Sequence, residues 1–373
     1  MKIARIEIYQ ADLPVKGGVY RLSGGREYHS FDATFARVLC DDGTEGWGET
    51  TPFGANYIPS HGASLRATLD ILAPALLGTD PRLHDRRWEM MEAVALGFRD
   101  ARAALDIACW DASAKASGLP LCDTIGGRVA GAVPVISSIG GGTPEEMRAK
   151  VAAHRQAGYI GHSVKIGATE AEGGPALDAE RIHASMADRQ PGEWFLVDAN
   201  NGLTPEHIIR LLSLLPDGLD FVLEAPCNTW RETLSVRARC PVPLLLDELI
   251  VTEADLVQAI TEDACDGVGL KVTKQGGITP MIRQRTIASA AGMVMSIQDT
   301  TGSQIAFAAI LHIAQSTPRH LLRCALDPRE MVEAEIAAFD ALIKDGGATA
   351  PNLPGLGVTP NPDILGKPVQ IYD

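Results

Sequence analysis

The sequence lacks the features that mark several large classes of protein. Its seven cysteines are odd in number, scattered, and form no CxxC pair, so neither a disulfide framework nor a cysteine-rich zinc site is expected. Basic residues are in deficit, 33 against 47 acidic residues, and the net charge of −14 disfavours binding to nucleic acid or to an anionic membrane. No apolar run approaches the roughly 20 residues that span a bilayer.

The first fifteen residues also lack the continuous apolar core of a signal peptide, because polar and apolar side chains alternate there. With the cysteine usage, this predicts a reducing, cytoplasmic location. The chain has 373 residues and 46% apolar content, which is enough for one large domain with a buried core and a smaller one.

What is present is a series of five short apolar runs, each ending in a charged residue. The charged ends are Lys165, Asp198, Glu224, Asp247 and Lys271. The last four are separated by 26, 23 and 24 residues, about the length of a strand, a helix and two loops. The spacing therefore predicts consecutive βα units of a parallel α/β barrel, with all five charged residues at the carboxyl ends of its strands, where barrels place their active sites.

The chain around these runs fits the same scheme. Threonine N-caps at Thr143, Thr204, Thr252 and Thr279, three of them followed by proline, predict helix starts between the strands. The predicted barrel strands are 133–139, 162–166, 194–198, 221–224, 244–247, 267–271, 293–297 and 321–325. Residues 1–60 alternate like an antiparallel meander, and residues 62–123 have a helical pattern. Within that pattern we interpret Asp106 and Asp111 as capping and surface salt-bridging residues.

The layout of the charged residues predicts a metal site. In a ring of eight strands, Lys165 on the second strand lies opposite Lys271 on the sixth, and the three acids lie on the arc between them. Three converging carboxylates need a counter-charge, and oxygen ligands without histidine or cysteine favour Mg²⁺. A single such acid could be a helix cap, and a single lysine a phosphate contact or a Schiff-base nucleophile. Two opposed lysines beside three acids favour acid–base chemistry at a metal-bound carboxylate.

These motifs resemble the enolase superfamily, in its mandelate racemase and muconate-lactonizing branch. The resemblance covers the whole chain and is carried by residues 197–200 (VDAN), 223–226 (LEAP), 246–248 (LDE) and 270–277 (LKVTKQGG). It implies a (β/α)7β TIM-like barrel at 128–327, an α+β capping domain at 1–127, and a C-terminal segment at 328–373 that packs back on the cap. It also implies that Asp198, Glu224 and Asp247 bind one Mg²⁺, that Lys165 and Lys271 are the acid/base pair, and that the chain forms a homo-oligomer.

Within that branch, the residues around Lys165 (HSVKIG), the single Lys271 and the loop 22–26 (LSGGR) look most like the cis-3-hydroxy-L-proline dehydratases. The implied activity is Mg²⁺-dependent removal of the α-proton of this amino-acid carboxylate and loss of water, giving Δ1-pyrroline-2-carboxylate in hydroxyproline catabolism. The same two lysines would serve a proline-betaine or hydroxyproline-betaine 2-epimerase or a related racemase. Ser163 replaces the first lysine of the Lys-x-Lys common in relatives, which leaves the proton affinity of Lys165 open.

Substrate contacts are expected from Tyr20, Arg26, Tyr57, Asn200, Asp299 and Thr300, whereas we interpret Lys274 as a polar loop residue. A muconate-type cycloisomerase is a third possibility. Two readings from other classes stay open, a Schiff-base aldolase that is indifferent to EDTA and a metal-stabilised binding protein without turnover.

Overall fold

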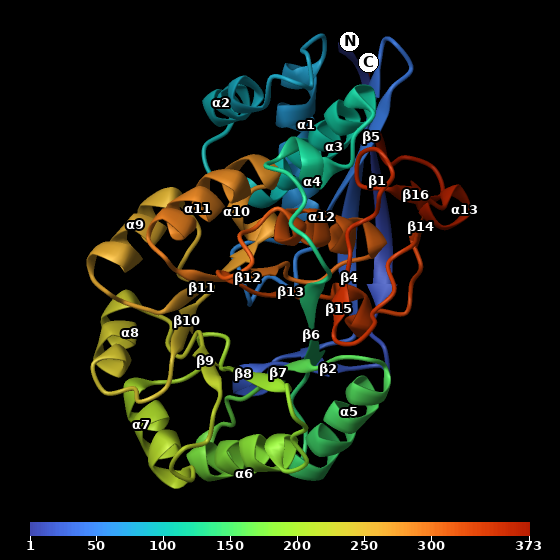
Figure 1. The fold of residues 1–373 in the computed structure, drawn as a ribbon. Coiled ribbons are helices and arrows are strands. Elements are labelled where there is room, and N and C mark those ends of the chain that lie inside the picture. The colour runs from blue at the N-terminus through green and yellow to red at the C-terminus, as the bar shows by residue number, and fades with distance from the viewer.

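The computed structural model describes residues 1–373 and has two parts, a closed barrel and a cap (Figure 1). The barrel has eight parallel strands in sequence order, and pairing of the last with the first closes the ring. They are β6 (Val133–Ile139), β7 (Gly161–Lys165), β8 (Trp194–Asp198), β9 (Val222–Glu224), β10 (Leu244–Leu246), β11 (Gly267–Lys271), β12 (Val294–Gln298) and β13 (Leu322–Leu326). The predicted barrel is confirmed, with strand ends shifted by no more than about one residue.

Helices cover the outside of the ring, one or more after each strand up to β12 (Figure 1). They are α5 (Pro144–Gln156), α6 (Gly174–Met186), α7 (Pro205–Leu214), α8 (Trp230–Arg237), α9 (Glu253–Thr261), α10 (Val272–Gln275), α11 (Ile278–Ala290) and α12 (Gln304–Gln315), with a 3-10 turn at Glu170–Glu172. Thr143, Thr204 and Thr252 each cap a helix by accepting a backbone N–H three residues on, as predicted.

The fourth predicted cap is wrong. Helix α11 starts at Ile278 with Gly277 as its cap residue, so Thr279 lies inside the first turn. Asp106, which comes from the capping domain, takes over the capping role by accepting hydrogen bonds from Thr279 N at 2.8 Å and Thr279 Oγ1 at 2.7 Å.

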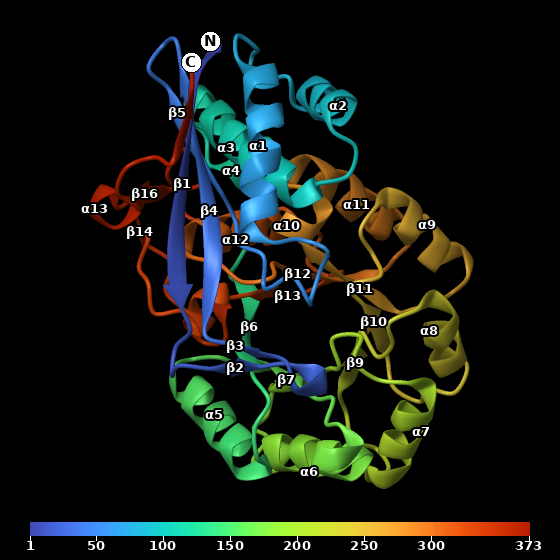
Figure 2. The ribbon, with the colours of Figure 1, turned by 180° about the vertical axis from the view of Figure 1, so that it is seen from behind.

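The cap combines an antiparallel sheet with helices. The sheet order is β17-β1-β4-β5, formed by β1 (Ile3–Pro14), β4 (Ser30–Cys40), β5 (Glu45–Thr50) and β17 (Gln370–Tyr372). Its helices are α1 (Gly62–Leu76), α2 (His84–Val94), α3 (Arg99–Ser117) and α4 (Leu121–Thr124), and a small hairpin is made by β2 (Tyr20–Arg21) and β3 (Glu27–Tyr28) around a 3-10 turn at Ser23–Gly25. Because β17 pairs with β1, the two chain ends lie together (Figure 2).

The C-terminal segment divides its contacts between the two parts. Besides β17 on the cap, it contains a 3-10 turn at Pro328–Met331, β14 (Ala337–Phe339), β15 (Gly347–Ala348), β16 (Val358–Pro360) and α13 (Pro362–Leu365). Strand β15 pairs with β6 of the barrel, and β14 pairs with β16. None of the helices in the structure combines the length and the apolar content that a bilayer crossing requires.

The cap and the barrel share buried structure. One apolar core of 74 residues includes both barrel residues and cap residues such as Phe31 and Trp110. The interface between the cap and the barrel is therefore part of a continuous hydrophobic core. The predicted salt bridging of Asp106 and Asp111 is confirmed, because Asp106 pairs with Arg87 at 3.1 Å and Asp111 with Lys115 at 2.7 Å, and Asp106 also has the predicted capping role. The predicted surface location is wrong, because both aspartates are fully buried. Asp111 accepts the backbone N–H groups of Trp47 and Leu356 at 2.8 and 2.7 Å, and so ties helix α3 to the sheet and to the C-terminal segment.

Candidate active site

The strand register places Lys165, Asp198 and Glu224 side by side on three neighbouring barrel strands. Lys165 is the cross-strand partner of Asp198, and Asp198 is the partner of Glu224. Asp247 immediately follows β10, whose Leu245 pairs with Glu224. The three carboxylates therefore lie at the carboxyl ends of three neighbouring strands, and each residue is 2% exposed or less.

The two lysines approach this group from different sides. Lys165 and Lys271 end β7 and β11, which are four strands apart in either direction around the ring. The ammonium of Lys165 forms an ion pair with Asp198, and that of Lys271 forms one with Asp247. The site thus has an amine at each flank of the carboxylate group, as the sequence predicted.

Glu224, the middle carboxylate, has no lysine partner. Its Oε1 accepts a hydrogen bond from Gln298 Nε2 at 3.0 Å. Burial, followed by repulsion from Asp198 and Asp247, raises its pKa well above the ordinary value. Charge crowding therefore remains at the centre of the group even with both lysines in place.

The same negative charges also raise the pKa of each lysine, which favours the charged ammonium. Burial alone would lower the pKa of Lys165, but the negative charges of Asp198 and its neighbours together outweigh burial, and the pKa is raised. For Lys271 burial is likewise outweighed, chiefly by Asp247. A cation that neutralised these carboxylates would remove the negative charge that raises the pKa of the lysines. Burial would then dominate and lower the pKa, which favours the neutral amine that a base requires.

The donor set fits a hard divalent cation. Three buried carboxylates with no nearby imidazole or thiolate are the ligands that Mg²⁺ prefers, and their mutual repulsion is the cost that such an ion relieves. No three His, Cys, Asp or Glu side chains in the structure already lie in metal-binding geometry, and the outer two carboxylates form ion pairs with the lysines.

A loop of the cap closes over the Lys165 side. Gly24 N donates to Gly167 O at 2.9 Å, and Arg26 reaches Asn200 O at 3.1 Å. Ser23 sits against Gly167, where a Cβ would come within 2.3 Å of the Ser23 Cβ, so a side chain at position 167 would lift the loop. A cavity of about 140 Å³ remains between this loop and β7, lined in part by Arg21, Lys165 and Arg181.

The predicted substrate contacts fall into two groups. Tyr57 contacts the Lys271 ammonium, and its ring centroid is 4.9 Å from that nitrogen. Asn200 Nδ2 donates to Asp198 Oδ2 at 2.9 Å, while its buried Oδ1 has no partner. Arg26 also lies over the Tyr57 ring. Asn200 thus contacts the carboxylate group directly and Tyr57 contacts it through Lys271, whereas Arg26 reaches only the Tyr57 ring and backbone or serine oxygens.

The other predicted contacts are engaged within the protein. The Tyr20 hydroxyl bonds to Ser138. Asp299 accepts from Thr273 N at 3.1 Å and Thr273 Oγ1 at 3.0 Å, and the Thr300 hydroxyl donates to Thr51 O. Contact of these side chains with a substrate stays a prediction.

Family models cover most of the chain. The model described as "Enolase C-terminal domain-like" matches residues 146–364, and the one described as "Mandelate racemase / muconate lactonizing enzyme, N-terminal domain" matches residues 28–126. The chain belongs to the enolase superfamily.

Individual relatives agree with this membership. A structure from Roseovarius nubinhibens ISM of the mandelate racemase/muconate lactonizing enzyme type, complexed with magnesium, is 70% identical with a TM-score of 0.99, covering 100% of both chains. The cis-3-hydroxy-L-proline dehydratase of Roseibium aggregatum is 37% identical over 100% of both chains. The N-succinyl-L-Arg/Lys racemase of Bacillus cereus is 28% identical over 85% of each. Other matched relatives of this enolase-superfamily enzyme are epimerases and cycloisomerases.

Sequence reasoning missed three residues that contact the candidate ligands or their neighbours, namely Gln298, Glu248 and Lys274. Gln298 bonds Glu224 across the barrel interior, and Glu248 Oε1 accepts from Asn200 Nδ2 at 3.1 Å. The interpretation of Lys274 as a polar loop residue is wrong, because it is buried on α10 and ion-paired with Asp247 at 2.6 Å. Lys271 ends strand β11 and Lys274 lies on α10, so the spacing of the two lysines gave no signal that Lys274 faces Asp247.

Proposed function

We propose that this enzyme is a Mg²⁺-dependent dehydratase of cis-3-hydroxy-L-proline. The observation that carries the proposal is the pair of lysines on opposite barrel strands, one at each flank of a triple-carboxylate group. The full-length likeness to a cis-3-hydroxy-L-proline dehydratase supports the choice of substrate.

The substrate's stereochemistry suits two opposed lysines. Its hydroxyl is on the same ring face as its carboxylate, so the α-proton is on the other face and loss of water is an anti elimination. Such a reaction needs a base on one face and an acid on the other. We assign the base to Lys165 and the acid to Lys271.

The proposed reaction balances without a redox partner. Lys165 Nζ takes the α-proton, the electrons of the broken C–H bond form the Cα–C3 double bond, and the C3–O bond breaks as Lys271 gives a proton to the leaving hydroxyl. The products are water and an enamine, which tautomerises to Δ1-pyrroline-2-carboxylate. Asp198, Glu224 and Asp247 would hold the Mg²⁺. When bound, this ion would neutralise charge that develops on the substrate carboxylate as the α-proton leaves.

A second candidate is 2-epimerisation of proline betaine or hydroxyproline betaine, or racemisation of a related amino acid. It is supported by the racemases and epimerases among the relatives. The same lysines would serve it, since one would remove the α-proton and the other would return a proton to the opposite face.

Proton NMR in D₂O distinguishes the two candidates. The protein with Mg²⁺ is incubated with cis-3-hydroxy-L-proline, and in parallel with trans-4-hydroxy-L-proline betaine. We expect the first compound to convert to the cyclic imine. If only the betaine exchanges its α-proton and inverts, the protein is an epimerase and the dehydratase proposal fails.

A further inference from the structure

Lys274 has an unusual set of partners for a residue just beyond a strand end. Its ammonium donates to the backbone oxygen of Asp247, to Asp247 Oδ1 at 2.6 Å and to Gly269 O at 3.3 Å. The side chain is only 4% exposed. All three N–H groups of the ammonium are therefore used within the protein, and none is free to reach a substrate.

The two oxygens of Asp247 are consequently not equivalent. Oδ1 and the backbone oxygen are held by Lys274, whereas Oδ2 accepts no well-formed hydrogen bond and lies against the Lys271 ammonium. A Cβ at Gly269 would lie 3.1 Å from both the Asp247 Cβ and Glu224 Oε1, so these two acids meet over the bare backbone of Gly269. Rotation of the Asp247 carboxylate would break its contact with Lys274.

The turn that carries Lys274 is itself tied down on both sides. Gln275 Oε1 accepts from Lys271 N at 2.8 Å, and Gln275 Nε2 donates to Ile250 O at 3.0 Å beyond the end of β10. Thr273 donates to Asp299 beyond the end of β12. Helix α10 thus links the ends of three strands, which fixes the ammonium of Lys274 relative to Asp247.

We propose that Lys274 is a positioning residue for the third metal ligand. By holding Oδ1 and the backbone oxygen, it leaves Oδ2 of Asp247, on the Lys271 side, as the oxygen offered to the divalent cation. The inference rests on the metal assignment of the proposed function and not on the identity of the substrate.

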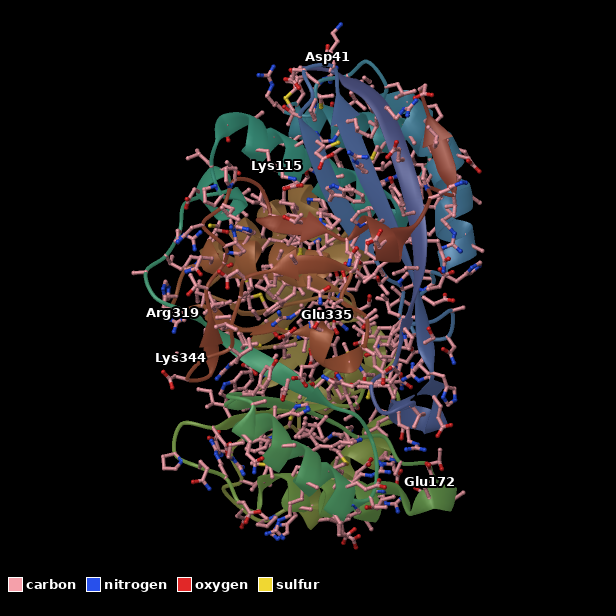
Figure 3. The ribbon with its side chains drawn as sticks, turned by 90° about the vertical axis from the view of Figure 1, so that its right-hand side faces the viewer. Asp41, Lys115, Glu172, Arg319, Glu335 and Lys344 are labelled. Atoms are coloured by element: carbon pink, nitrogen blue, oxygen red, sulfur yellow. The ribbon has the colours of Figure 1, made fainter.

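The test is Mg²⁺ affinity, measured by isothermal titration calorimetry on EDTA-treated protein. Partners that orient a metal ligand typically contribute about 10- to 100-fold to affinity, and we expect a loss of that size in Lys274→Met. Lys115→Met is the matched control, because it also removes an ammonium 2.7 Å from a fully buried aspartate, Asp111. Lys115 lies in the capping part of the molecule (Figure 3), so its loss should lower the melting temperature and leave Mg²⁺ affinity within about twofold.

Lys274→Arg separates geometry from charge. It retains the positive charge, but a planar guanidinium cannot direct three N–H bonds as an ammonium does, so we expect a smaller loss of roughly three- to tenfold. This variant also serves as the test if Lys274→Met does not fold. Wild-type affinity in Lys274→Arg, or unchanged or tighter binding in Lys274→Met, would overturn the positioning role.

Failure of the wider proposal gives a different pattern. If the wild type binds no Mg²⁺, both the metal assignment and this inference fall. If the wild type binds Mg²⁺ but does not dehydrate cis-3-hydroxy-L-proline, the substrate assignment fails while the titrations of the Lys274 variants still decide this inference.

Discussion

The two lysines that flank the carboxylates are held very differently. Lys165 contacts a single acidic partner, Asp198; its side chain is 12% exposed, and it borders the small cavity under the cap loop. Lys271 is 5% exposed and is held between Asp247 and the Tyr57 hydroxyl, with its backbone N–H bonded to Gln275. One amine has room to move, and the other is clamped.

This difference suits the two tasks of an elimination. A base that removes a proton from carbon must swing from its carboxylate towards the substrate, whereas an acid must keep its proton aimed at the leaving group. Proton transfer needs short donor–acceptor distances in the reacting complex, so the clamped amine is the better acid and the freer one the better base. The asymmetry therefore supports the proposed roles of Lys165 and Lys271.

The turns that follow the two lysines show a related contrast. After Lys165, Asp178 accepts from Gly167 N and Ala168 N and is also ion-paired with Arg181 at 3.1 Å. After Lys271, Asp299 accepts from Thr273 and Thr300, but no basic side chain lies within ion-pair distance of it. Both turns are pinned by a buried aspartate, but only the one near Lys165 has its charge compensated.

Replacing each lysine by alanine should have the largest effect and should test most directly whether the two lysines have different roles. We expect Lys165→Ala and Lys271→Ala each to reduce dehydration at least about 10³-fold, because each removes a proton-transfer group. The α-proton should still exchange with D₂O in Lys271→Ala and not in Lys165→Ala. Proton NMR of the recovered substrate measures this, with Mg²⁺ titration as a control that the metal site persists.

The reverse exchange pattern would assign the base to Lys271 and refute our reading of the asymmetry. Full turnover in Lys165→Ala would remove that residue from the mechanism altogether.

Glu224 offers a change that should affect both sides equally, since it belongs to neither lysine. We expect Glu224→Ala to lose Mg²⁺-dependent activity by about 10²-fold or more, because a central ligand is gone. Calorimetric titration and turnover before and after EDTA provide the measurement. Wild-type activity that survives in EDTA would contradict the metal assignment and favour a Schiff-base or metal-free reaction.

The sequence contained enough to predict the barrel and the clustering of the five charged strand-end residues. Strand length, helix length and the threonine caps are local properties, and the carboxyl ends of parallel strands necessarily meet at one face of the ring. For that reason Asp198, Glu224 and Asp247 could be placed together from their spacing. Thr279 shows the limit of local signals, because the capping partner of α11 comes from Asp106, 173 residues away.

The supporting residues depend on contacts that spacing does not encode. Gln298 meets Glu224 across the barrel interior, and Tyr57 reaches Lys271 from the cap, 214 residues away in sequence. Lys274 is the intermediate case. Its place just past the end of a strand could be predicted, but only its contacts with Asp247 at the end of β10 show that it is buried and ion-paired.

The uncompensated charge of Asp299 should make the Lys271 side sensitive to pH. Burial raises the pKa of Asp299 to about 7 from an ordinary value near 3.8. Between these values the native state keeps a proton that the unfolded chain has lost, so the free energy of unfolding falls as pH rises from about 4 to 7. Asp299→Asn should remove this part of the slope, a change on the order of 4 kcal/mol across the range.

Urea unfolding of the wild type and Asp299→Asn across this pH range measures the difference. Asp178→Asn is the comparison on the other side, where the variant should lower stability because it breaks the ion pair with Arg181. Parallel pH profiles of the wild type and Asp299→Asn would show that Asp299 is ionised throughout and that the two turns do not differ in this way.

Two tyrosines provide the smallest and most selective test of the clamp on Lys271. Tyr57→Phe removes the hydroxyl that contacts the ammonium but keeps the ring, whose centroid is 4.9 Å from the nitrogen. We expect kcat to fall roughly tenfold, because one hydrogen bond to the Lys271 ammonium is lost and the ammonium is then held less firmly in position. Tyr20→Phe is the matched change near Lys165. Its hydroxyl bonds to Ser138 and not to the lysine, so kcat should change less than about threefold, with any larger effect appearing in KM. Equal losses of kcat in the two variants would mean that the Tyr57 hydroxyl has no special role in holding Lys271, and the contrast between a clamped acid and a mobile base would have to rest on Asp247 alone.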